Sequence, residues 1–513
     1  MNAQGFFKSN GRAAGDSGVM PGLFAISPEH VTLSVEYSQT NAWLVSFSAG
    51  HVNGNNKYNG YSVAAVVALE EDSVEGWIEA YHKCCQKKKG APDCVGFRVD
   101  YERELVELIG EVYGGTYRPS PGKSFVVLHP CPREIITAEF RDRIVQTWIA
   151  MRIEPLLEER FTAQGNLSHN CRKGFGLDSA IRALSGSIDR ARARLGADAW
   201  VAKVDVKAFF ASIDTVRLWG LLEGFIAGRY RGPERELLLR LTEMTVLHRP
   251  HIGARQVSPP ALYDRVPPHK RLCNAPEGIG LAPGNLISQL LANFYMSFVA
   301  GNLAESCARN GCEPPVEYVD DFAFAGPKDG LLRVIADARG ILADYGLTLH
   351  PDKVYLQPAT HGIRFVGRVV KPGRIYTASR TLGSLSDALA ATCAICRRIR
   401  DGDVSIDALA ALRGSLSTLN SLLGTTRRTA SRNMRERIFG RADPAFFDVC
   451  YTRGSWESAH PKEQYKLINK LLEIELNNGL ALYPTGTRKG RHGAARRSAP
   501  QDNQLSHRAA SRG

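Results

Sequence analysis

Membrane spans and secretory signals are absent from the sequence. No apolar run approaches the about 20 mostly apolar residues that cross a bilayer, and Met1 to Gly5 begin no secretory signal. We therefore expect a cytoplasmic protein with no membrane partner. Overall disorder is excluded as well, because 44% of the 513 residues are hydrophobic. That length suits a sizeable core and roughly three or four domains.

A cysteine pattern typical of a disulfide framework or of a complete zinc site is also missing. The chain has 11 cysteines, but a protein of this size does not depend on a disulfide framework. Cys84, Cys85 and Cys94 with His82 suggest zinc, yet no second cysteine pair at C-x-x-C spacing completes a four-ligand set. A C-x-x-C spacing that starts at Cys393 falls in a segment with a helical pattern. We expect reduced cysteines that pack in cores.

Acidic residues are the minority among the charged side chains. The sequence has 52 Asp and Glu against 65 Lys and Arg, a formal net charge of +13 and a pI near 9.2. This excess favours a polyanionic partner, and release of its counterions would make binding weaken as the salt concentration rises. The alternative is that the basic side chains only solvate the surface.

The most informative motif is Tyr318 to Asp321, which places two adjacent aspartates between short apolar stretches. The pattern predicts a strand-turn-strand hairpin that holds both carboxylates at its tip. Carboxylate oxygens suit magnesium, and two such ions about 4 Å apart stabilise the attacking and leaving oxygens of a phosphoryl displacement. An ordinary surface turn is the alternative, because so short a pattern often occurs by chance.

Two upstream segments favour the metal site over the surface turn. Residues 200–205 have the pattern of an apolar strand that ends in Asp205, which supplies a third carboxylate at a strand end. Between the two acidic segments, Gly278 to Gly284 form a glycine-rich turn that opens an amphipathic helix from Asn285 to Tyr295. Taken singly, this second segment is only a helix start.

In this order the segments resemble the palm of a reverse transcriptase, and the resemblance covers roughly residues 73 to 440. Asp205 with Phe209 and Phe210 is similar to motif A of that family, Pro283 to Gln289 to motif B, and Tyr318 to Asp321 to motif C. Other parts of the family match along the chain. They are Leu349 to Lys353 for motif D, Gly362 to Gly367 for the primer grip, and Pro132 to Ile135, Phe140 to Gln146 and Cys171 to Gly176 for the fingers.

The resemblance implies an α+β fold, a right-hand polymerase with fingers, a palm that contains an antiparallel sheet and a helical thumb, after an N-terminal β-rich extension. The tail is rich in Arg, Gly, Ala and Ser, and it either clamps RNA or only keeps the protein soluble. The predicted domains are an N-terminal module, 1–72; fingers, 73–190; palm, 191–372; thumb, 373–445; a C-terminal helical segment, 446–484; and a basic disordered tail, 485–513.

The same resemblance implies catalytic roles. Asp205, Asp320 and Asp321 would bind two Mg²⁺ ions, or Mn²⁺, with the backbone carbonyl of Val206 as a further ligand. One ion would activate the primer 3′-hydroxyl and the other would hold the incoming triphosphate. Lys353 would be the general acid that protonates pyrophosphate, and a plain surface lysine is the alternative.

Binding roles follow from the resemblance too. Phe210 matches the steric gate of the family, whose ring would collide with a ribose 2′-hydroxyl, whereas Phe209 packs in the core. Arg133 matches the fingers residue that grips the triphosphate. The nucleotide would also contact Pro283, Gly284, Ser288 and Gln289; the primer, Phe365, Val366 and Gly367; and the template-primer backbone, Arg172, Lys173, Arg397, Arg398, Arg427 and Arg428.

Within reverse transcriptases, Ser288 and Gln289 after Gly-Asn-Leu are similar to the lineage of diversity-generating retroelements, as are Val266 to Leu272. The lineage implies mutagenic cDNA made from an RNA template and deoxynucleoside triphosphates, with a small basic accessory protein and a structured non-coding RNA as partners. One departure is Leu-Ala-Pro-Gly at Leu281 to Gly284, where the lineage has Leu-Pro-Ile-Gly. Pro283 thus replaces a residue linked to adenine infidelity, which leaves fidelity at template adenine open.

The N-terminal module lies outside the polymerase motifs. Asn41 to Val63 alternate strand-like stretches with Asn/Gly turns, and they resemble the variable region of the target proteins of diversity-generating retroelements. Asn, Gly, Tyr, Ser and His crowd this stretch, and all five can be encoded by codons that derive from AAC or AAT through changes at adenines alone. The segment is then a fused remnant, a docking module or coding sequence over a template repeat. An Asn/Gly-rich loop in a small β module is the alternative.

Apolar spacing near 3.6 residues predicts helices on both sides of the palm. A lysine run, Lys87 to Lys89, lies between the first two helices and is either a phosphate contact or a solvated loop. Arg-rich faces on the later helices suit contact with a nucleic-acid backbone. The helical segments are Val74 to Lys83, Tyr101 to Val112, Leu382 to Arg400, Ile406 to Phe439 and Trp456 to Asn477.

Three functions stay open from the sequence. The leading one is an RNA-directed DNA polymerase of a diversity-generating retroelement. The second is an antiphage defence reverse transcriptase, which the long N-terminal extension and Pro283 favour; retron signatures are not evident in the chain. The third is a ligand-binding or scaffold protein with an inactive palm, and the three intact carboxylates argue against it.

Overall fold

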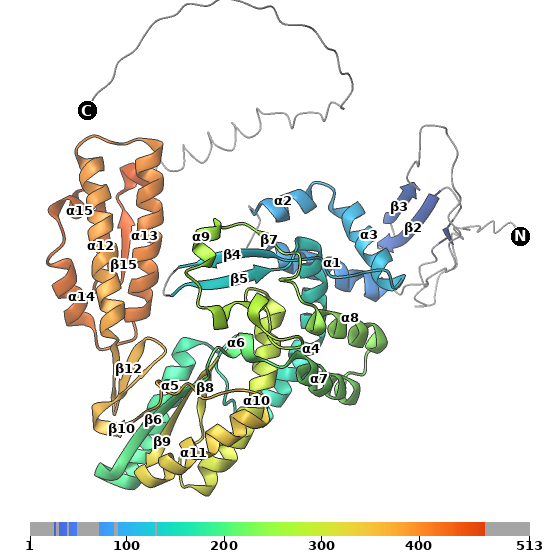
Figure 1. Cartoon of the computed structure of the whole chain (residues 1–513). Coiled ribbons are helices and arrows are strands. Elements are labelled where there is room, and N and C mark those ends of the chain that lie inside the picture. The colour runs from blue at the N-terminus through green and yellow to red at the C-terminus, as the bar shows by residue number, and fades with distance from the viewer. Residues whose placement is uncertain are drawn as a thin grey trace, which may run out of the picture. The chain divides into compact units, whose positions relative to one another are not determined.

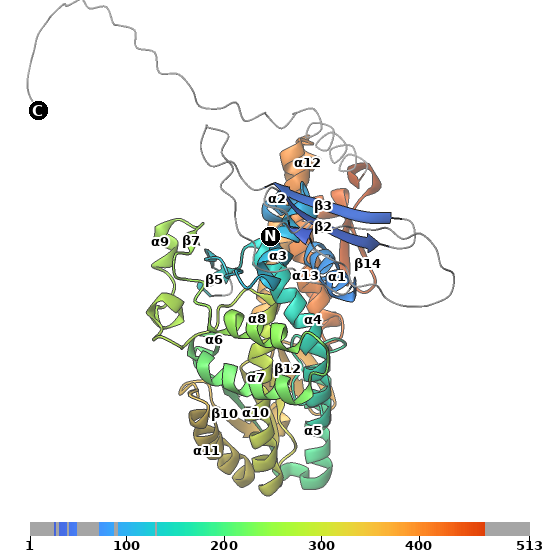
Figure 2. The same cartoon turned by 90° about the vertical axis from the view of Figure 1, so that its right-hand side faces the viewer.

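The computed structural model describes residues 25–26, 30–37, 41–48, 71–86, 91–128 and 131–466. The chain divides into two compact units, which are drawn in Figure 1 and from a second side in Figure 2. Helices and small, mostly antiparallel sheets make up both units, which confirms the predicted α+β class. The first unit comprises Met1–Arg380 and Arg428–Ala430, and the second unit comprises Thr381–Arg427 and Ser431–Gly513.

An antiparallel sheet of three strands comes first in the chain. Its order is β1-β2-β3, from β1 (Ala25–Ile26), β2 (His30–Tyr37) and β3 (Asn41–Ser48). β3 covers the first strand-like stretch of the Asn/Gly-rich segment. The remainder of that segment, 49–63, and the lysine run at 87–89 lie outside the described residues, so their roles stay predictions.

The helices that follow share an aromatic core. The Trp77 ring stacks on Trp148 with 4.8 Å between the ring centroids, and both side chains are fully buried. Such a stack stabilises by about 0.5–1.5 kcal/mol beyond the area that it buries. The helices predicted at 74–83 and 101–112 are confirmed as α1 and α3. The four helices are α1 (Glu71–Cys85), α2 (Pro92–Arg98), α3 (Tyr101–Tyr113) and α4 (Phe140–Ala163).

A small sheet carries Arg133. Its central strand β4 (Lys123–Val127) pairs antiparallel with β5 (Arg133–Thr137) and parallel with β7 (Arg255–Gln256). The Ser124 hydroxyl donates to the buried carboxylate of Glu134 at 2.8 Å, which fixes the two strands side by side.

The central sheet of the first unit has four antiparallel strands in the order β10-β6-β9-β8. Alternate side chains face different helices, as expected for strands buried on both faces. Val201 and Ala323 pack with α5, whereas Ala202 and Phe322 pack with the neighbouring helices α10 and α11. The elements are β6 (Ala199–Asp205), β8 (Val316–Tyr318), β9 (Asp321–Pro327), β10 (Tyr355–Pro358), α5 (Leu177–Leu195), α10 (Leu286–Arg309) and α11 (Lys328–Asp344).

Shorter elements complete the first unit. The last three strands form a sheet of their own in the order β11-β12-β13. These elements are α6 (Phe209–Ser212), α7 (Thr215–Arg229), α8 (Arg235–Leu247), α9 (Pro260–Tyr263), β11 (Ile363–Phe365), β12 (Arg368–Lys371) and β13 (Arg374–Thr377).

The second unit is built mainly of helices, and the predicted helices at 382–400 and 406–439 are confirmed, with a break after Thr426. Their apolar faces form one core that includes Leu389, Leu412 and Phe446. The elements are α12 (Ser379–Arg400, whose first two residues belong to the first unit), α13 (Ile406–Thr426), α14 (Arg432–Phe439), α15 (Pro444–Val449), β14 (Cys450–Arg453) and β15 (Ser458–Pro461).

The helix predicted from Trp456 to Asn477 is wrong over its first residues. There β15 pairs antiparallel with β14, and the turn between them contains Gly454 and Trp456 with positive φ angles of 62° and 58°. The Trp456 ring stacks on Phe439 at 5.0 Å, so burial of this ring outweighs local helical spacing. Residues beyond 466 lie outside the described part of the chain.

The cysteines are free thiols, and seven of them are buried. The core location predicted for all of them is wrong for Cys131, Cys171 and Cys273, which are exposed. Cys131 and Cys171 lie in loops, and Cys273 lies in a short 3₁₀ turn. Among the helices of the described residues, none has the length and apolar character required to cross a membrane.

Candidate active site

Three carboxylates meet at one end of the central sheet. Asp205 is the last residue of β6 and lies directly opposite Asp321, the first residue of β9. Asp320 belongs to the two-residue turn between β8 and β9, in which Val319 has a positive φ of 62°. The predicted hairpin and the predicted strand that ends in Asp205 are therefore both confirmed.

Backbone hydrogen bonds hold this end of the sheet together. The Val206 N–H donates to the Asp320 carbonyl at 3.0 Å, and the His350 N–H donates to the Asp205 carbonyl at 2.8 Å. The second bond brings the loop before β10, and with it Lys353, to the carboxylates.

The carboxylates disfavour one another's ionisation. Burial, followed by the charges of Asp321 and Asp205, raises the pKa of Asp320 to about 6. Burial also raises the pKa of Asp321, although Lys203 opposes the shift. Clustered, partly desolvated carboxylates of this kind gain most from a nearby cation.

Two lysines supply that positive charge in the structure. The Lys353 ammonium lies 2.8 and 3.0 Å from the two carboxylate oxygens of Asp205, and Lys203 lies 2.8 Å from Asp321. Partial burial acts to lower the pKa of Lys353, but its bond to Asp205 and the neighbouring aspartates raise it overall. Lys353 is thus an ammonium at neutral pH.

The donor chemistry of the aspartates fits a divalent cation, because hard carboxylate oxygens are what magnesium and manganese prefer. Within the described residues, no three His, Cys, Asp or Glu side chains are arranged so that they could hold a metal ion. Two of the three aspartates are engaged by lysines instead. Cation binding at Asp205 would therefore require Lys353 to move away from it.

A cavity of about 590 Å³ opens in front of the carboxylates. Seven of the residues predicted for the site lie together in the wall of this cavity. They are Arg133, Asp205, Val206, Phe210, Pro283, Asp320 and Lys353. Sequence reasoning missed five charged or histidine residues of the wall: Glu134, Lys207, His269, Lys270 and His350.

The two phenylalanines after Asp205 occupy different environments. Phe209 is buried in the core, whereas Phe210 is half-buried and lines the cavity. Ala208 before them has a positive φ of 47°, which turns the chain from β6 into the short helix α6. The Leu281 N–H donates to the Phe210 carbonyl at 2.7 Å and fixes this turn.

The glycine-rich turn before α10 is packed against β5. The Ile136 N–H donates to the Pro283 carbonyl at 3.0 Å, and the Asn285 side chain accepts from the Ala138 N–H at 2.9 Å. Gly284 has a φ of 121°, and a Cβ there would lie 2.6 Å from the Ile135 side chain. The missing side chain of Gly284 thus lets the turn approach strand β5 closely.

Ser288 and Gln289 lie outside this cavity wall. Ser288 is buried in the first turn of α10. Gln289 is exposed and accepts a hydrogen bond from the Cys171 thiol at 3.1 Å. Their nucleotide-binding role is not supported by their positions.

Sequence reasoning also missed Asn170, which holds the acidic turn in place. Its side-chain oxygen accepts from the Val319 N–H at 2.9 Å, and its amide group donates to the Asn293 side chain of α10. Asn293 in turn donates to the Asn170 carbonyl at 2.6 Å, and both asparagines are buried. Nearby Glu317 is fully buried, and burial raises its pKa to about 8, so this carboxyl is neutral at pH 7.

Of the predicted primer-grip residues, Phe365 ends β11, and Val366 and Gly367 form the turn between β11 and β12. Phe365 is fully buried, while Val366 and Gly367 have positive φ angles of 38° and 82°. These angles describe a tight turn, and the three residues are not part of the wall of the acidic cavity.

The nucleic-acid contact predicted for Arg172 is wrong, because the structure encloses this side chain. Its side chain is fully buried, and its guanidinium donates to the Glu158 carboxylate and to the Ser168 carbonyl, the latter at 2.8 Å. The guanidinium also lies over the Phe175 ring at 3.9 Å. A residue so enclosed stabilises its loop and is not presented to a ligand. Its neighbour Lys173 is 84% exposed, with a long ion pair to Glu154 at 3.6 Å.

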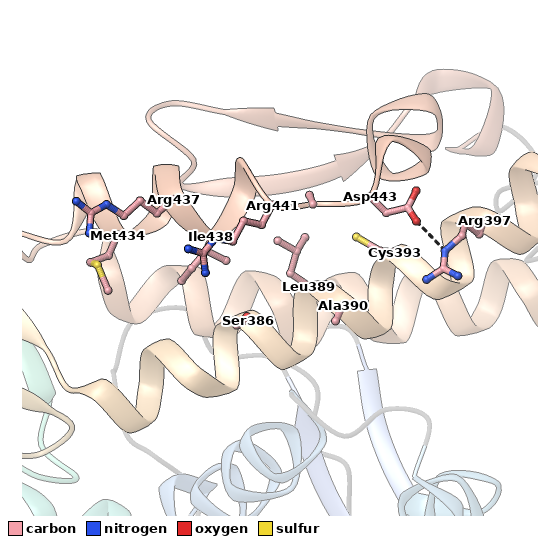
Figure 3. Close-up of a pocket in the computed structure, with 11 residues that line it drawn as sticks. Ser386, Leu389, Ala390, Cys393, Arg397, Met434, Arg437, Ile438, Arg441 and Asp443 are labelled. Atoms are coloured by element: carbon pink, nitrogen blue, oxygen red, sulfur yellow. Dashed lines mark ion pairs between the residues drawn. The ribbon is translucent and has the colours of Figure 1, made fainter.

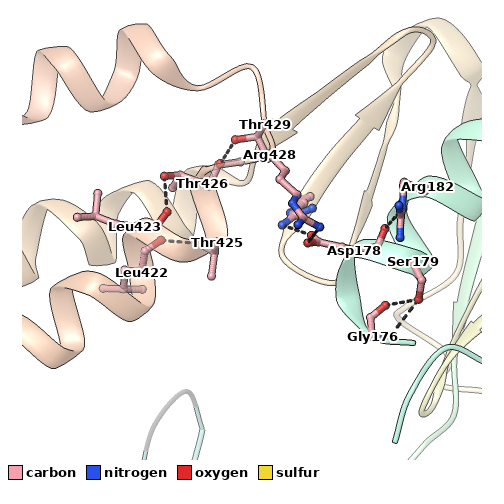
Figure 4. Close-up of polar contacts among 12 residues, drawn as sticks. Gly176, Asp178, Ser179, Arg182, Leu422, Leu423, Thr425, Thr426, Arg428 and Thr429 are labelled. Carbon is pink, nitrogen blue, oxygen red and sulfur yellow. Dashed lines mark hydrogen bonds and ion pairs between the residues drawn. The ribbon is translucent and has the colours of Figure 1, made fainter. Parts of the chain in front are cut away.

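Arg428 makes its contacts within the first unit. Figure 4 shows its side chain directed at Asp178, with 2.7 Å between the charged groups. Arg368 pairs with the other oxygen of Asp178, also at 2.7 Å. Arg428 is 70% exposed, so this ion pair leaves much of its guanidinium accessible.

The other predicted backbone contacts belong to the second unit and are engaged by protein groups. Arg397 pairs with Asp443 at 2.8 Å, at the end of a groove of about 420 Å³ between α12 and the segment of α14 (Figure 3). Arg398 pairs with Asp403 at 2.6 Å, and Arg427 donates to the Glu457 carbonyl at 3.1 Å. Arg397 and Arg398 are more than half exposed and the Arg427 bond lies at the surface, which keeps a role in binding open.

Comparison with known proteins gives weak likenesses. No protein-family model and no curated protein matches the chain. Among solved structures, the chain is similar to telomerase from Candida albicans in complex with a TWJ fragment of telomeric RNA, with 13% identity, a TM-score of 0.37, and coverage of 67% of this chain and 64% of that chain. It is also similar to apo telomerase from Candida tropicalis, with 12% identity, a TM-score of 0.38, and coverage of 72% and 68%. Since both TM-scores are below 0.5, neither likeness assigns a function to this chain.

Proposed function

We propose that this protein is an RNA-directed DNA polymerase. The observation that carries the proposal is the placement of Asp205 opposite Asp321, with Asp320 in the adjoining turn. Asp205 and Asp320 line a cavity that Arg133 and Phe210 also line. Carboxylates at neighbouring strand ends and a guanidinium across a cavity suit a metal-bound triphosphate.

In this proposal Asp205, Asp320 and Asp321 hold two Mg²⁺ ions, or Mn²⁺, with the Val206 carbonyl as a further ligand. The ions, when bound, supply positive charge that stabilises the attacking and leaving oxygens of nucleotidyl transfer. Arg133 binds the triphosphate through its planar guanidinium. Phe210 limits the room at the sugar and so selects deoxynucleotides.

Lys353 has two tasks in sequence. It neutralises Asp205 at 2.8 Å in the structure, and after release from that carboxylate its ammonium donates a proton to the departing pyrophosphate. The contact with Asp205, which raises the pKa of Lys353, keeps its amine protonated until that release.

The test is primer extension on an RNA template with the full-length protein, deoxynucleoside triphosphates and Mg²⁺. We expect cDNA synthesis by the wild type and none by the Asp320→Asn, Asp321→Asn double variant. Asp329→Asn, an exposed position at the start of α11, is the control and should extend normally. Extension by the double variant would refute the assignment, and an inactive wild type would favour a binding or scaffold role.

The sugar gate has its own experiment. Because the Phe210 ring lines the cavity, Phe210→Ala should admit ribonucleotides. The measurement is the ratio of kcat/KM for a ribonucleotide to that for the matching deoxynucleotide. Phe209→Leu, a change in the core, is the control, and unchanged selectivity in Phe210→Ala would remove the gate from the proposal.

For its biological role we propose mutagenic cDNA synthesis in a diversity-generating retroelement, with a structured non-coding RNA and a small basic accessory protein as partners. Gln289 and Val266 to Leu272 support this lineage through their resemblance to it. Antiphage defence is the second candidate, favoured by Pro283 in the cavity wall and by the long N-terminal extension. Sequencing cDNA made from co-purified RNA separates them: errors concentrated at template adenines support diversification, and accurate copies without a nearby template repeat support defence.

A further inference from the structure

A short proline-rich segment, residues 267–274, contributes to the wall of the acidic cavity. It consists of two 3₁₀ turns, η2 (Pro268–Lys270) and η3 (Leu272–Asn274). Two consecutive prolines restrict its backbone at the start. The Lys270 N–H donates to the Pro267 carbonyl at 2.9 Å, and the Asn274 side chain donates to the Pro268 carbonyl at 2.9 Å. The segment therefore has one defined local shape.

Leu272 anchors the segment to the site. Its buried side chain packs against Ile136 of β5 and Ala282 of the turn before α10. At Gly280 a Cβ would lie 2.6 Å from the Leu272 side chain, so the glycine makes room for this contact. The segment is thus packed on the strand that carries Arg133.

The anchored segment presents two basic side chains to the cavity. His269 and Lys270 are exposed, and both line the cavity that Asp205 and Asp320 also line. In the part of the chain that the structure describes, neither side chain has a hydrogen-bond or ion-pair partner. Lys203 and Lys353, by contrast, are both engaged by aspartates. Among the described residues, the side chains of Arg133 and Lys207 in the same wall also have no such partner. Of these four basic groups, Arg133, His269 and Lys270 belong to β5 and to the segment packed on it.

The distribution of charge defines the chemistry of that ligand. Asp205 and Asp320, which suit divalent cations, form one part of the wall. Arg133, His269 and Lys270 form another, together with Glu134, whose carboxylate accepts from the Ser124 hydroxyl. A polyphosphate that carries a metal ion satisfies both parts, because its oxygens bind the metal and also accept from basic side chains. The volume of about 590 Å³ lies within the about 300–1,000 Å³ of small-molecule sites.

We propose that Lys270, assisted by His269, binds the triphosphate of the incoming nucleotide as a second basic arm beside Arg133. This inference rests on the proposed polymerase function and adds two nucleotide-binding residues to it. A template strand is the less suitable occupant, because its phosphates are spread along a backbone and do not converge on the carboxylates and Phe210.

Steady-state kinetics tests the role. Lys270→Met removes the ammonium and keeps an apolar stem, and Lys270→Arg preserves the charge. We expect Lys270→Met to raise the KM for deoxynucleotides about tenfold with kcat nearly unchanged, and Lys270→Arg to retain most of the binding. His269→Ala should raise KM less. Arg265→Ala, exposed in the preceding loop and outside the cavity wall, is the control and should change neither constant.

A binding measurement separates this inference from the polymerase proposal. Inorganic tripolyphosphate with Mg²⁺, titrated into the protein by calorimetry, should bind the wild type and Arg265→Ala alike and Lys270→Met about tenfold more weakly. Equal binding by Lys270→Met, or a KM that rises for the template-primer and not for the nucleotide, would overturn the assignment. If tripolyphosphate binding depends on Lys270 but the wild type makes no cDNA, the polyphosphate site stands and the polymerase function fails.

Discussion

At the scale of single residues, Asn170 determines where the acidic turn lies. Its side chain accepts from the N–H of half-buried Val319 and donates to Asn293, and both asparagines are buried. An amide in this position fixes the turn without adding charge next to the carboxylates. Asn170 is therefore a positioning residue that acts through Asp320.

Replacing Asn170 should lower kcat as well as the free energy of unfolding. Asn170→Ala leaves a buried N–H without its acceptor, which costs about 1–3 kcal/mol, and we expect kcat to fall about 10- to 100-fold. Asn420→Ala is the matched control, since Asn420 also bridges backbone groups, at 2.7 Å to both the N–H and the carbonyl of Ala459, in the second unit. Primer-extension kinetics and thermal melting should show lower stability in both variants but lower kcat only in Asn170→Ala. Equal kcat values would mean that Asn170 has a purely structural role.

Asp320 makes the stability of the site depend on pH. The pKa of Asp320 is about 6 in the folded state, against an ordinary value of 3.8. Between pH 3.8 and pH 6, the folded state therefore keeps a proton on this carboxyl that the unfolded state has released. Stability from this group is thus lost as the pH rises to about 6 and stays lost above it.

Cation binding should restore that stability where Asp320 is ionised. We expect Mg²⁺ to raise the Tm by several degrees at pH 8 and very little at pH 5. Thermal melting with and without Mg²⁺ at both pH values measures this, and Asp320→Asn should abolish most of the response at pH 8. Equal Mg²⁺ shifts at the two pH values would contradict a cation site at Asp320.

Sequence patterns located the acidic residues but not the groups that hold them. Asp205 and Asp321 could be predicted because each lies at the end of an apolar strand, a local signal. Asn170 could not, because its partner Val319 lies far away in the sequence and only the fold brings them together. Arg172 was misassigned for a related reason: Glu158 and the aromatic rings that enclose it are not apparent from a basic motif.

At the scale of elements, the contact between β5 and the turn before α10 sets the geometry of the cavity. β5 carries Arg133, the turn carries Pro283, and hydrogen bonds from Ile136 and Ala138 join the two. Close approach depends on Gly284, whose missing side chain leaves room for β5. The hairpins and helices of the first unit could be predicted from periodicity, whereas this packing depends on shape that no pattern encodes.

Gly284→Ala should separate β5 from α10. The new methyl group would lie 2.6 Å from Ile135 and 3.2 Å from the Ile136 carbonyl, at a φ of 121° that alanine rarely adopts. We expect a loss of about 1–3 kcal/mol of stability and a higher KM for deoxynucleotides, because Arg133 moves with β5. Urea denaturation and nucleotide titrations measure the two effects.

Gly340→Ala is the control for this substitution. Gly340 is exposed within α11, and a Cβ there meets nothing within 4 Å. Because alanine favours a helix over glycine by about 1 kcal/mol, this variant should be slightly more stable, with an unchanged KM. If Gly284→Ala behaves like Gly340→Ala, the contact between β5 and α10 is not what positions Arg133.

At the scale of the whole molecule, the net charge of +13 predicts salt-sensitive binding to a polyanion. The structure shows that part of this positive charge is paired within the protein. Arg172, Arg397, Arg398, Arg427 and Arg428, all predicted to contact nucleic acid, are engaged by protein groups. Only Arg172 is fully enclosed, so the other four keep accessible guanidinium groups. A further concentrated source of positive charge is the sequence from Thr485 to Gly513, with seven Lys or Arg and one Asp.

Removing residues 485–513 decides whether this tail binds RNA or only aids solubility. If it binds, the truncated protein should have a lower affinity for an RNA template-primer at low salt. Its plot of log Kd against log salt should also be shallower, by about 0.7–0.9 for each phosphate that the tail had neutralised. A full-length variant with the seven basic tail residues changed to Gln should match the truncation, because charge and not length is responsible. Identical slopes for the wild type and both variants, with kcat preserved, would mean that the tail only aids solubility and that basic residues elsewhere in the chain bind the RNA.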